Sequence, residues 1–206
     1  METTEKILRG AEELFMRYGI KSITMDEIAK HLGISKKTIY QFFEDKDEIV
    51  FMSCKKHLCS DAECLQVISR GAANAVEEIF NLSEFLRNTV VRTHPSVLFD
   101  LQKYHKSSWD LYLSHKETVI EKYISSNIRR GIEEGLYRAE INVSIISHIR
   151  LDMIQMAFNP DIFPPTRYNL MEVHMQLMEH FIYGLLSPKG YETLQELKNK
   201  ARNLAN

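Results

Sequence analysis

Hydrophobic residues recur at intervals of three and four positions along most of this chain, the spacing that places them on one face of an α-helix. The apolar stripe of the first predicted helix, over residues 4–18, consists of Ile7, Leu8, Ala11, Leu14, Phe15 and Tyr18. Gly19 follows this stripe and is expected to end the helix. The alternating pattern of strands bounded by turn dipeptides is absent, and glycine and proline are scarce. The sequence therefore predicts an all-α fold.

Turn-forming residues divide the rest of the chain into further helices. Gly71 marks a break, and His94-Pro95 ends a helix because the residue before proline disfavours the helical conformation. Asn142 is expected to cap a helix, and residues 159–165 are expected to form a linker. Helices are predicted over residues 45–69, 71–93, 95–104, 107–133, 142–158, 167–186 and 187–202. The chain should contain about nine or ten helices in all.

Residues 23–48 carry the most specific local pattern, two short helices joined by a tight turn. Thr24 is placed as an N-cap, and the Glu27 side chain three positions later can bond back to the Thr24 amide, which makes a capping box. Gly33 suits the left-handed residue that ends the first helix, and Ser35 is placed to cap the second. A second helix entered through a short glycine turn is the helix-turn-helix pattern, whose second helix can enter the major groove of DNA.

The outer face of the second helix explains why its partner should be DNA. Lys36, Lys37 and Thr38 occupy its first turn, and Gln41 follows. Lysine can donate to guanine, glutamine can pair with adenine, and the threonine methyl can contact thymine, so these four side chains are predicted to reach base edges. Lys46, at the start of the next helix, is predicted to contact a phosphate. The alternative interpretation is a solvated helix pair whose lysines face only water.

The segment from about Ile7 to Ile49 closely resembles the DNA-binding domain of the tetracycline-repressor (TetR) family of bacterial transcription regulators. The matching residues are Ile7, Ala11, Phe15, Gly19, Thr24, Ile28, Ala29, Gly33, Ser35, Tyr40, Phe43, Lys46 and Ile49. The resemblance implies an all-α homodimer with an N-terminal three-helix, helix-turn-helix DNA-binding domain, placed at residues 1–46. It also implies a larger helical domain, residues 47–206, for dimerisation and for an inducing ligand.

The same resemblance assigns roles within the DNA-binding domain. It implies that Thr24, Tyr40 and Lys46 hold phosphates while the four residues named above face the bases. Ser35 is added to the phosphate contacts, since the N-terminus of a helix attracts anions through its unpaired amides and its dipole. Acidic residues outnumber basic ones in residues 1–50, so they must face away from the duplex.

Two helices near the C-terminus are candidates for a dimer interface because both carry apolar residues over a wide arc. The predicted interface residues are Ile149, Met153, Met156, Leu170, Val173, Leu177, Phe181 and Leu185. In the TetR family the last two major helices pair with those of a second subunit as a four-helix bundle. Two helix-turn-helix units related by a two-fold axis would read a palindrome. The alternative is that both are simply central core helices.

The ligand pocket is predicted among the aromatic and polar residues of the segment 80–123, together with methionines, which adapt to apolar guests. The predicted lining is Phe80, Phe85, Phe99, Tyr104, Trp109, Tyr112, Met153 and Met175. The alternative is an ordinary packed core with aromatic residues at helical spacing.

A stripe of potential metal ligands lies within about 80° on the predicted 45–69 helix. It consists of Cys54, His57, Asp61 and Cys64. A metal or redox role is one interpretation, but a His57–Asp61 hydrogen bond between adjacent turns would account for two of the four. No metal and no cofactor is expected. The three cysteines form no Cys-x-x-Cys pair, so a disulfide framework is not expected either.

Composition and charge fit this interpretation without deciding it. The formal net charge is −2, so any attraction for DNA must come from the local placement of basic residues. No apolar run approaches the length of a membrane span, and the first residues lack the apolar core of a signal peptide. A cytoplasmic protein without a membrane partner is therefore expected.

The sequence as a whole indicates a homodimeric repressor that an unknown small molecule releases from a palindromic operator in double-stranded DNA. A ligand would shift the 45–69 helix and so change the separation of the two recognition helices, and the dimer would then lose its contacts with one half-site of the operator. One alternative is a TetR-like DNA binder controlled by a protein partner or by no effector. A remote alternative is a helical enzyme or carrier with a docking module. An enzyme is not expected, since the sequence has no nucleophile, zinc-protease or phosphate-loop motif.

Overall fold

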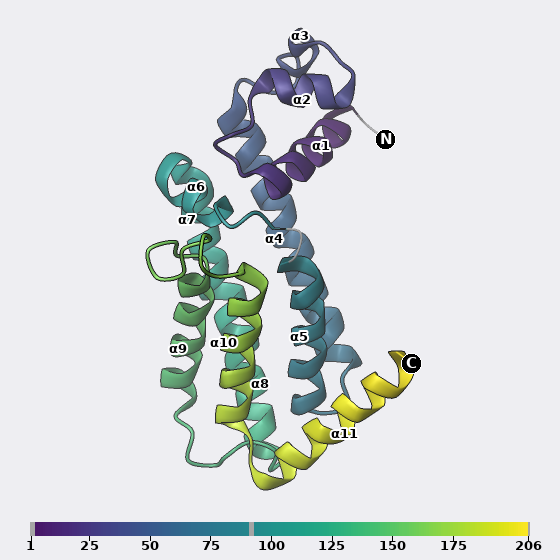
Figure 1. Cartoon of the computed structure of the whole chain (residues 1–206), viewed down its shortest axis with the longest axis vertical. Helices are drawn as coiled ribbons and strands as arrows, with labels where there is room; N and C mark the ends of the chain where they lie inside the picture. Colours follow the sequence, from purple (N-terminus) through teal and green to yellow (C-terminus); the bar gives the residue numbers. More distant parts are fainter. Residues whose placement is uncertain (1–2, 91–92, 206) are drawn as a thin grey trace.

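The computed structural model describes residues 3–90 and 93–205. Eleven α-helices and one π-helical turn run through these described residues (Figure 1). The one sheet-like contact in this part of the chain is an isolated antiparallel bridge between Tyr137 and Leu186. None of its helices is both long and apolar enough to cross a lipid bilayer. The predicted all-α fold is confirmed, with an N-terminal helix-turn-helix domain and a larger helical body.

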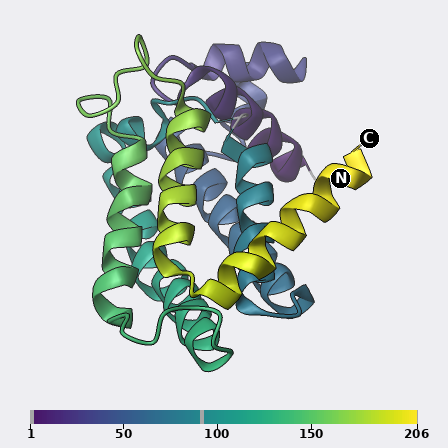
Figure 2. The ribbon, with the colours of Figure 1, turned by 60° about the horizontal axis from the view of Figure 1, so that its bottom comes forward.

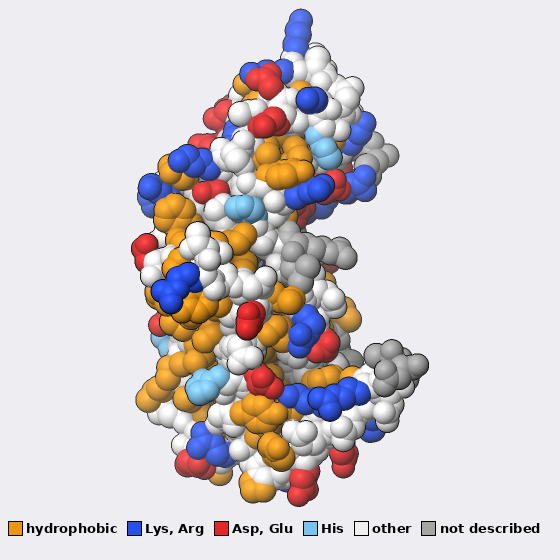
Figure 3. Space-filling model, viewed as in Figure 1, with side chains coloured by type: hydrophobic (Ala, Val, Ile, Leu, Met, Phe, Trp, Pro, Cys, Tyr) orange, Lys and Arg blue, Asp and Glu red, His pale blue; other side chains and the backbone are white. Residues whose placement is uncertain are grey.

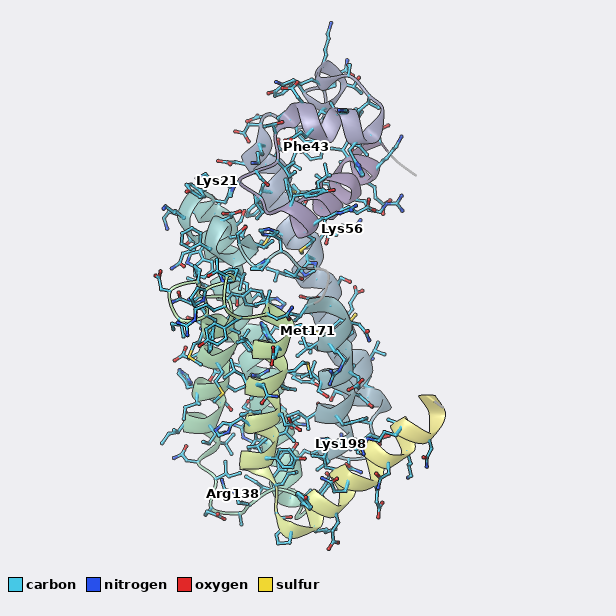
Figure 4. All side chains as sticks on the ribbon, viewed as in Figure 1. Lys21, Phe43, Lys56, Arg138, Met171 and Lys198 are labelled. Atoms are coloured by element: carbon cyan, nitrogen blue, oxygen red, sulfur yellow. The ribbon has the colours of Figure 1, made fainter. Side chains whose placement is uncertain are left out.

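The N-terminal domain is formed by α1 (Thr3–Tyr18), α2 (Met25–Leu32) and α3 (Lys36–Ile39). Their apolar faces meet in a buried N-terminal core, within which Figure 4 shows Phe43. This core consists of Ile7, Leu8, Ala11, Phe15, Ile20, Ile23, Met25, Ile28, Ala29, Ile39, Phe43, Ile49, Val50, Val97 and Leu101. Because its last four members come from α4 and α6, the core also joins the DNA-binding domain to the body.

The middle of the chain consists of α4 (Lys46–Gly71), α5 (Ala75–Val90), α6 (Val97–Tyr104), α7 (Lys106–His115), the π-helical turn η1 (Lys116–Ile120) and α8 (Glu121–Glu133). α4 leaves the N-terminal domain and runs down the body, and α5 returns beside it (Figure 1). α7, η1 and α8 follow one another without a loop. Single π turns inside α-helices often occur at functional sites.

The last three helices are α9 (Val143–Ala157), α10 (Leu170–Leu185) and α11 (Pro188–Ala205). α9 and α10 lie side by side and antiparallel, and α11 packs across α5 at the lower end of the body (Figures 1 and 2). With α5 and α8 they enclose a second, body core. It consists of Ala75, Val76, Ile79, Ile124, Ile128, Leu136, Tyr137, Leu151, Met178, Phe181, Ile182, Leu185, Leu186 and Leu194.

Most helix boundaries follow the capping residues. Asn142 caps α9 as predicted, because its Oδ1 accepts a hydrogen bond from the Ile145 amide at 3.1 Å. α10 begins later than predicted, at Leu170 with Asn169 as its cap, where a start at about Arg167 was expected. The predicted helix over 107–133 is divided by η1, which separates two elements where one was expected.

Candidate nucleic-acid interface and candidate ligand cavity

The turn between α2 and α3 is fixed by the hydrogen bonds that the sequence predicts. Thr24 Oγ1 accepts from the Glu27 amide at 3.2 Å, and the Thr24 amide donates to Glu27 Oε2 at 2.6 Å, which completes the capping box. Gly33 has a φ of 67°, the left-handed conformation that ends α2. Ser35 Oγ accepts from the Thr38 amide at 3.0 Å and caps α3. These caps hold the two helices as a helix-turn-helix unit.

The predicted base-contact residues lie on or beside α3, at the tip of the molecule in Figure 1. Lys37 and Gln41 are exposed, and their side chains form no hydrogen bond or ion pair with another described residue. Lys36 is also exposed, but its Nζ lies 2.8 Å from Asp26 Oδ2 on α2. Thr38 is half-buried, with its hydroxyl 2.8 Å from that of the α3 cap. Lys37 and Gln41 are thus free to reach a base, whereas Lys36 must first leave Asp26.

The four residues predicted to contact phosphates differ in how exposed their side chains are. Tyr40 is 49% exposed, and Thr24 and Ser35 are exposed although both serve as caps. Lys46 is half-buried, its Nζ donates to the Ile20 carbonyl at 2.6 Å, and burial lowers its pKa. Its ammonium is therefore turned into the N-terminal domain, and a phosphate contact at this position requires the side chain to leave Ile20. All four assignments stay predictions.

A cavity of about 250 Å³ lies at the junction of the N-terminal domain and the body. Side chains of α1 and of α4 to α10 form its walls, and most of them are apolar, such as Phe15, Leu58 and Leu86. The cavity exceeds the roughly 150 Å³ that suffices for benzene in an engineered apolar cavity. It can therefore hold a small molecule with an apolar body, and α1 contributes to its wall.

The structure corrects most of the predicted pocket lining. Only Phe85 and Tyr112 of the predicted residues line the cavity. The predicted residues that do not line it are Phe80, Phe99, Tyr104, Trp109, Met153 and Met175. Phe99 and Tyr104 are exposed on α6, and Trp109 stacks on Tyr112 with ring centroids 5.2 Å apart, one layer outside the cavity. Helical spacing identifies the faces of a helix, but it does not show which face meets the cavity.

One polar group on the cavity wall joins α1 to α4. His57 Nδ1 lies 2.9 Å from Glu12 Oε1, and His57 Nε2 lies 3.5 Å from Asp61 Oδ2. The hydrogen bond with Glu12 raises the pKa of His57, while burial raises the pKa of Asp61. The nearby His115 has a pKa lowered by burial. An imidazolium at His57 shared between two carboxylates is thus favoured, and it links the DNA-binding domain to the body.

A second polar group, which the sequence analysis missed, comes from α9 and α10. Arg150 is 3% exposed and His174 6% exposed, and both line the cavity. Burial lowers the pKa of Arg150 to about 10. Burial, followed by repulsion from Arg150, lowers the pKa of His174 to about 4. The position of Arg150 between Ile149 and Leu151, on a helix with a wide apolar arc, was the signal that could have identified this group.

Contacts within the protein explain the stripe of potential metal ligands on α4. The His57–Asp61 contact expected between adjacent turns is present. The Cys54 thiol donates to the Ser108 carbonyl at 3.8 Å, and burial raises the Cys54 pKa to about 11, so it is a poor thiolate at neutral pH. All three cysteines are free. Over residues 3–90 and 93–205, no group of three or more His, Cys, Asp or Glu side chains could hold a metal ion.

The predicted dimer residues are divided between the surface and the core. Those at least partly exposed are Ile149, Met153, Met156, Leu170 and Leu177. Val173, Phe181 and Leu185 are buried inside the protomer, which corrects their assignment, because their side chains are not available to a second copy. Ile145, one turn before Ile149 on the same helix, is 57% exposed. Figure 3 shows hydrophobic side chains on this α9–α10 side of the body.

Comparison with known proteins agrees with the helix-turn-helix geometry. Residues 7–51 match the model of the family described as bacterial regulatory proteins, tetR family. The chain is similar to the HTH-type transcriptional regulator YhgD of Bacillus subtilis, with 29% identity over 140 residues that cover 63% of this chain and 69% of YhgD.

Two solved structures show the same fold over almost the whole chain. One is a TetR-family transcriptional regulator from Agrobacterium tumefaciens, with a TM-score of 0.75, 13% identity, and coverage of 89% of this chain and 97% of that one. The other is a transcriptional regulator from Saccharomonospora viridis in complex with choline, with a TM-score of 0.71, 19% identity, and coverage of 89% and 97%. Residues 7–51 therefore form a helix-turn-helix domain of the tetR family of bacterial regulatory proteins, and the chain as a whole shares the fold of solved TetR-family regulators.

Proposed function

We propose that two copies of this regulator bind a palindromic operator as a homodimeric repressor, and that a small molecule in the cavity releases them. The observation that carries the proposal is the contribution of α1 to the cavity wall, through Phe15 and Met16. A molecule bound at this wall contacts the element on which α2 and α3 pack. It changes the DNA affinity only if it binds the two conformations with different affinity.

Two ion pairs beside the cavity connect α1 to α4. Glu12 lies 2.9 Å from His57, and Glu5 lies 3.3 Å from Lys56, which Figure 4 shows at this junction. A guest that displaces Glu12 breaks the first pair, which lets α1 tilt against α4. In a dimer such a tilt changes the separation of the two α3 helices, which must stay at about 34–36 Å to occupy successive major grooves.

Dimerisation is assigned to residues 47–206, and DNA binding to residues 1–46. Ile145 and Ile149 expose apolar side chains on adjacent turns of α9. They continue into partly exposed apolar residues of α9 and α10, namely Met153, Met156, Leu170 and Leu177. A contiguous exposed apolar face indicates an interaction surface, and here it supports a four-helix packing with a second copy. The choline complex of the similar S. viridis regulator supports a small-molecule effector over a protein partner.

The DNA-binding proposal is tested with two variants that each remove one positive charge. Lys37 lies on α3, whereas Lys122 is an exposed lysine of α8 in the body of the molecule. Binding to a fluorescent duplex is measured by anisotropy over a series of salt concentrations. We expect Lys37→Ala to weaken binding at least about threefold and to lower the salt slope by about one, because a lysine near the duplex displaces counterions. Equal effects of Lys37→Ala and Lys122→Ala would contradict the placement of α3.

A further inference from the structure

Arg150 is the one lysine or arginine among the described residues that is fully buried, and it lines the cavity. Its Nη2 lies 3.1 Å from Met178 Sδ, and its guanidinium carbon lies 5.4 Å from the centre of the Phe181 ring. Neither neighbour carries a charge. No carboxylate in the described part of the chain forms an ion pair with Arg150. A buried guanidinium without an anionic partner is strongly unfavourable, because it has lost its hydration without compensation.

The protein does compensate another arginine of the body. Arg130 lies 2.8 Å from Glu134 and 3.3 Å from Glu78, and it also donates to the Ala72 carbonyl. Arg130 is more exposed than Arg150 and yet has two carboxylates. The missing anion at Arg150 is therefore a feature of the cavity and not of the body as a whole.

Two histidines add unpartnered polar atoms to the same cavity. His174 Nε2 and His115 Nε2 are buried and form no hydrogen bond with a described residue. Buried polar atoms without a partner are rare in folded proteins. His115 directly precedes η1, and Ile120 at its other end also lines the cavity, so the π turn shapes this wall.

The carboxylates of the cavity do not require a cationic guest. Glu12 and Asp61 both contact His57, whose pKa is raised by the hydrogen bond with Glu12. Each of these carboxylates therefore has a cationic partner within the protein, although they share a single imidazolium. Arg150 is the charged group of the cavity that has no described partner of opposite charge within ion-pair distance.

We propose that the cavity takes an amphipathic anion, with an oxyanion such as a carboxylate bound by Arg150 and an apolar body against the remaining walls. Guanidinium binds a carboxylate through two parallel hydrogen bonds, and a neutral His174 can donate a third. The apolar lining, which includes Leu58 and Leu86, excludes a ligand that is polar throughout. This inference rests on the proposed function only in that the cavity is taken as the effector site.

The test compares octanoate, octanol and octyltrimethylammonium, which share an alkyl chain and differ in the charge of the head. Binding to the full-length protein is measured by calorimetry at pH 7.5. We expect octanoate to bind at least about tenfold more tightly than octanol, and the ammonium more weakly than either. Equal binding of octanoate and octanol, preference for the ammonium, or binding of none of the three would overturn the proposal.

Two variants locate the anion. Arg150→Met removes the charge at similar length and should abolish the preference for octanoate while octanol still binds. Arg129→Met removes an exposed arginine of α8 and should leave the preference intact. If Arg150→Met does not fold, Arg150→Lys is used instead. It keeps the positive charge without the planar guanidinium and should reduce the preference for octanoate over octanol by several-fold. An unchanged preference in the folded variant at position 150 overturns the proposal. DNA binding by the ligand-free protein, measured on the same samples, tests the proposed function separately.

Discussion

Single polar residues in the interior of this protein fall into two kinds. Near the lower end of the body they are fully partnered, as in the Tyr137 hydroxyl, which lies 2.9 Å from Asn127 Oδ1 and 3.0 Å from the Ala75 carbonyl. Around the cavity some of them are not, as in His174 and Arg150. Partnered groups specify how helices pack, whereas unpartnered ones reduce stability and are retained where they serve binding.

Gly131 provides a test of the partnered region. A Cβ at this position would lie 2.1 Å from Tyr137 Cδ2, and the Tyr137 side chain is fully buried and held at its hydroxyl. Gly131→Ala should therefore lower the free energy of unfolding by about 2 kcal/mol or more. Gly71→Ala is the control, since a Cβ there has no neighbour within 4 Å. Urea denaturation should show Gly71→Ala unchanged or slightly more stable, and equal loss in both variants would contradict the packing.

His174 predicts a dependence of stability on pH. Its pKa is about 4 in the folded protein against an ordinary value of 6.5, so the unfolded chain binds a proton first as pH falls. Stability should then decrease by about 1.4 kcal/mol per pH unit between these two values, and the loss should stop below the folded pKa. His174→Phe should remove this contribution, seen as a shallower slope in urea denaturation between pH 6.5 and 4.5. His180→Phe, at an exposed position of the same helix, controls for the loss of an imidazole. An unchanged slope in His174→Phe would contradict burial of a neutral imidazole.

At the scale of elements, α9 and α10 combine two roles. Their inner faces carry cavity and core residues such as Arg150 and Phe181, and their outer faces carry exposed apolar residues such as Ile149. A ligand that repositions α9 is thus one helix diameter from the proposed dimer interface. In the proposed dimer this arrangement would couple the cavity to the spacing of the two DNA-binding domains without a long pathway.

The outer face of α9 can be tested by a charge. Ile149→Glu should convert the dimer to a monomer, because burying an unpaired carboxylate in an apolar interface is unfavourable. Light scattering after size-exclusion chromatography measures the mass. Val67→Glu on α4 is the matched control, since Val67 is an apolar residue that is 71% exposed and lies outside the proposed interface. A dimer that persists in Ile149→Glu would place the interface elsewhere.

Elements set by local chemistry could be predicted from the sequence, and those set by packing could not. The Thr24–Glu27 capping box, the left-handed Gly33 and the Asn142 cap depend on residues within a few positions of one another. The lining of the cavity depends instead on how helices far apart in the chain rotate against each other. That is why Phe99 was expected inside and lies outside.

Lys46 shows the same limit within the candidate DNA interface. Its place in the pattern of the resembled family suggests a phosphate contact, but its ammonium bonds to the Ile20 carbonyl, 26 positions away. No local pattern encodes that contact. The position of η1 is a similar case, since the 107–133 segment has helical spacing throughout and the extra residue of the π turn leaves no compositional mark.

At the scale of the whole molecule, DNA binding has to overcome a formal net charge of −2. A single α3 helix of four residues offers few contacts, and screening by salt weakens each of them. Two copies that bind together double the contacts and fix their spacing. The proposed dimer would therefore supply the contacts that specific binding requires, and it predicts that the preferred DNA sequence is symmetric.

The most direct measurement is selection of bound fragments from a random pool of duplex DNA, followed by sequencing. A two-fold symmetric motif is expected, with half-sites one helical turn apart, or a multiple of it, as two α3 helices in successive major grooves require. Complexes on that motif should contain an even number of chains. Recovery of no enriched sequence, or of an asymmetric motif bound by one chain, would contradict a regulator that reads a palindrome with paired α3 helices.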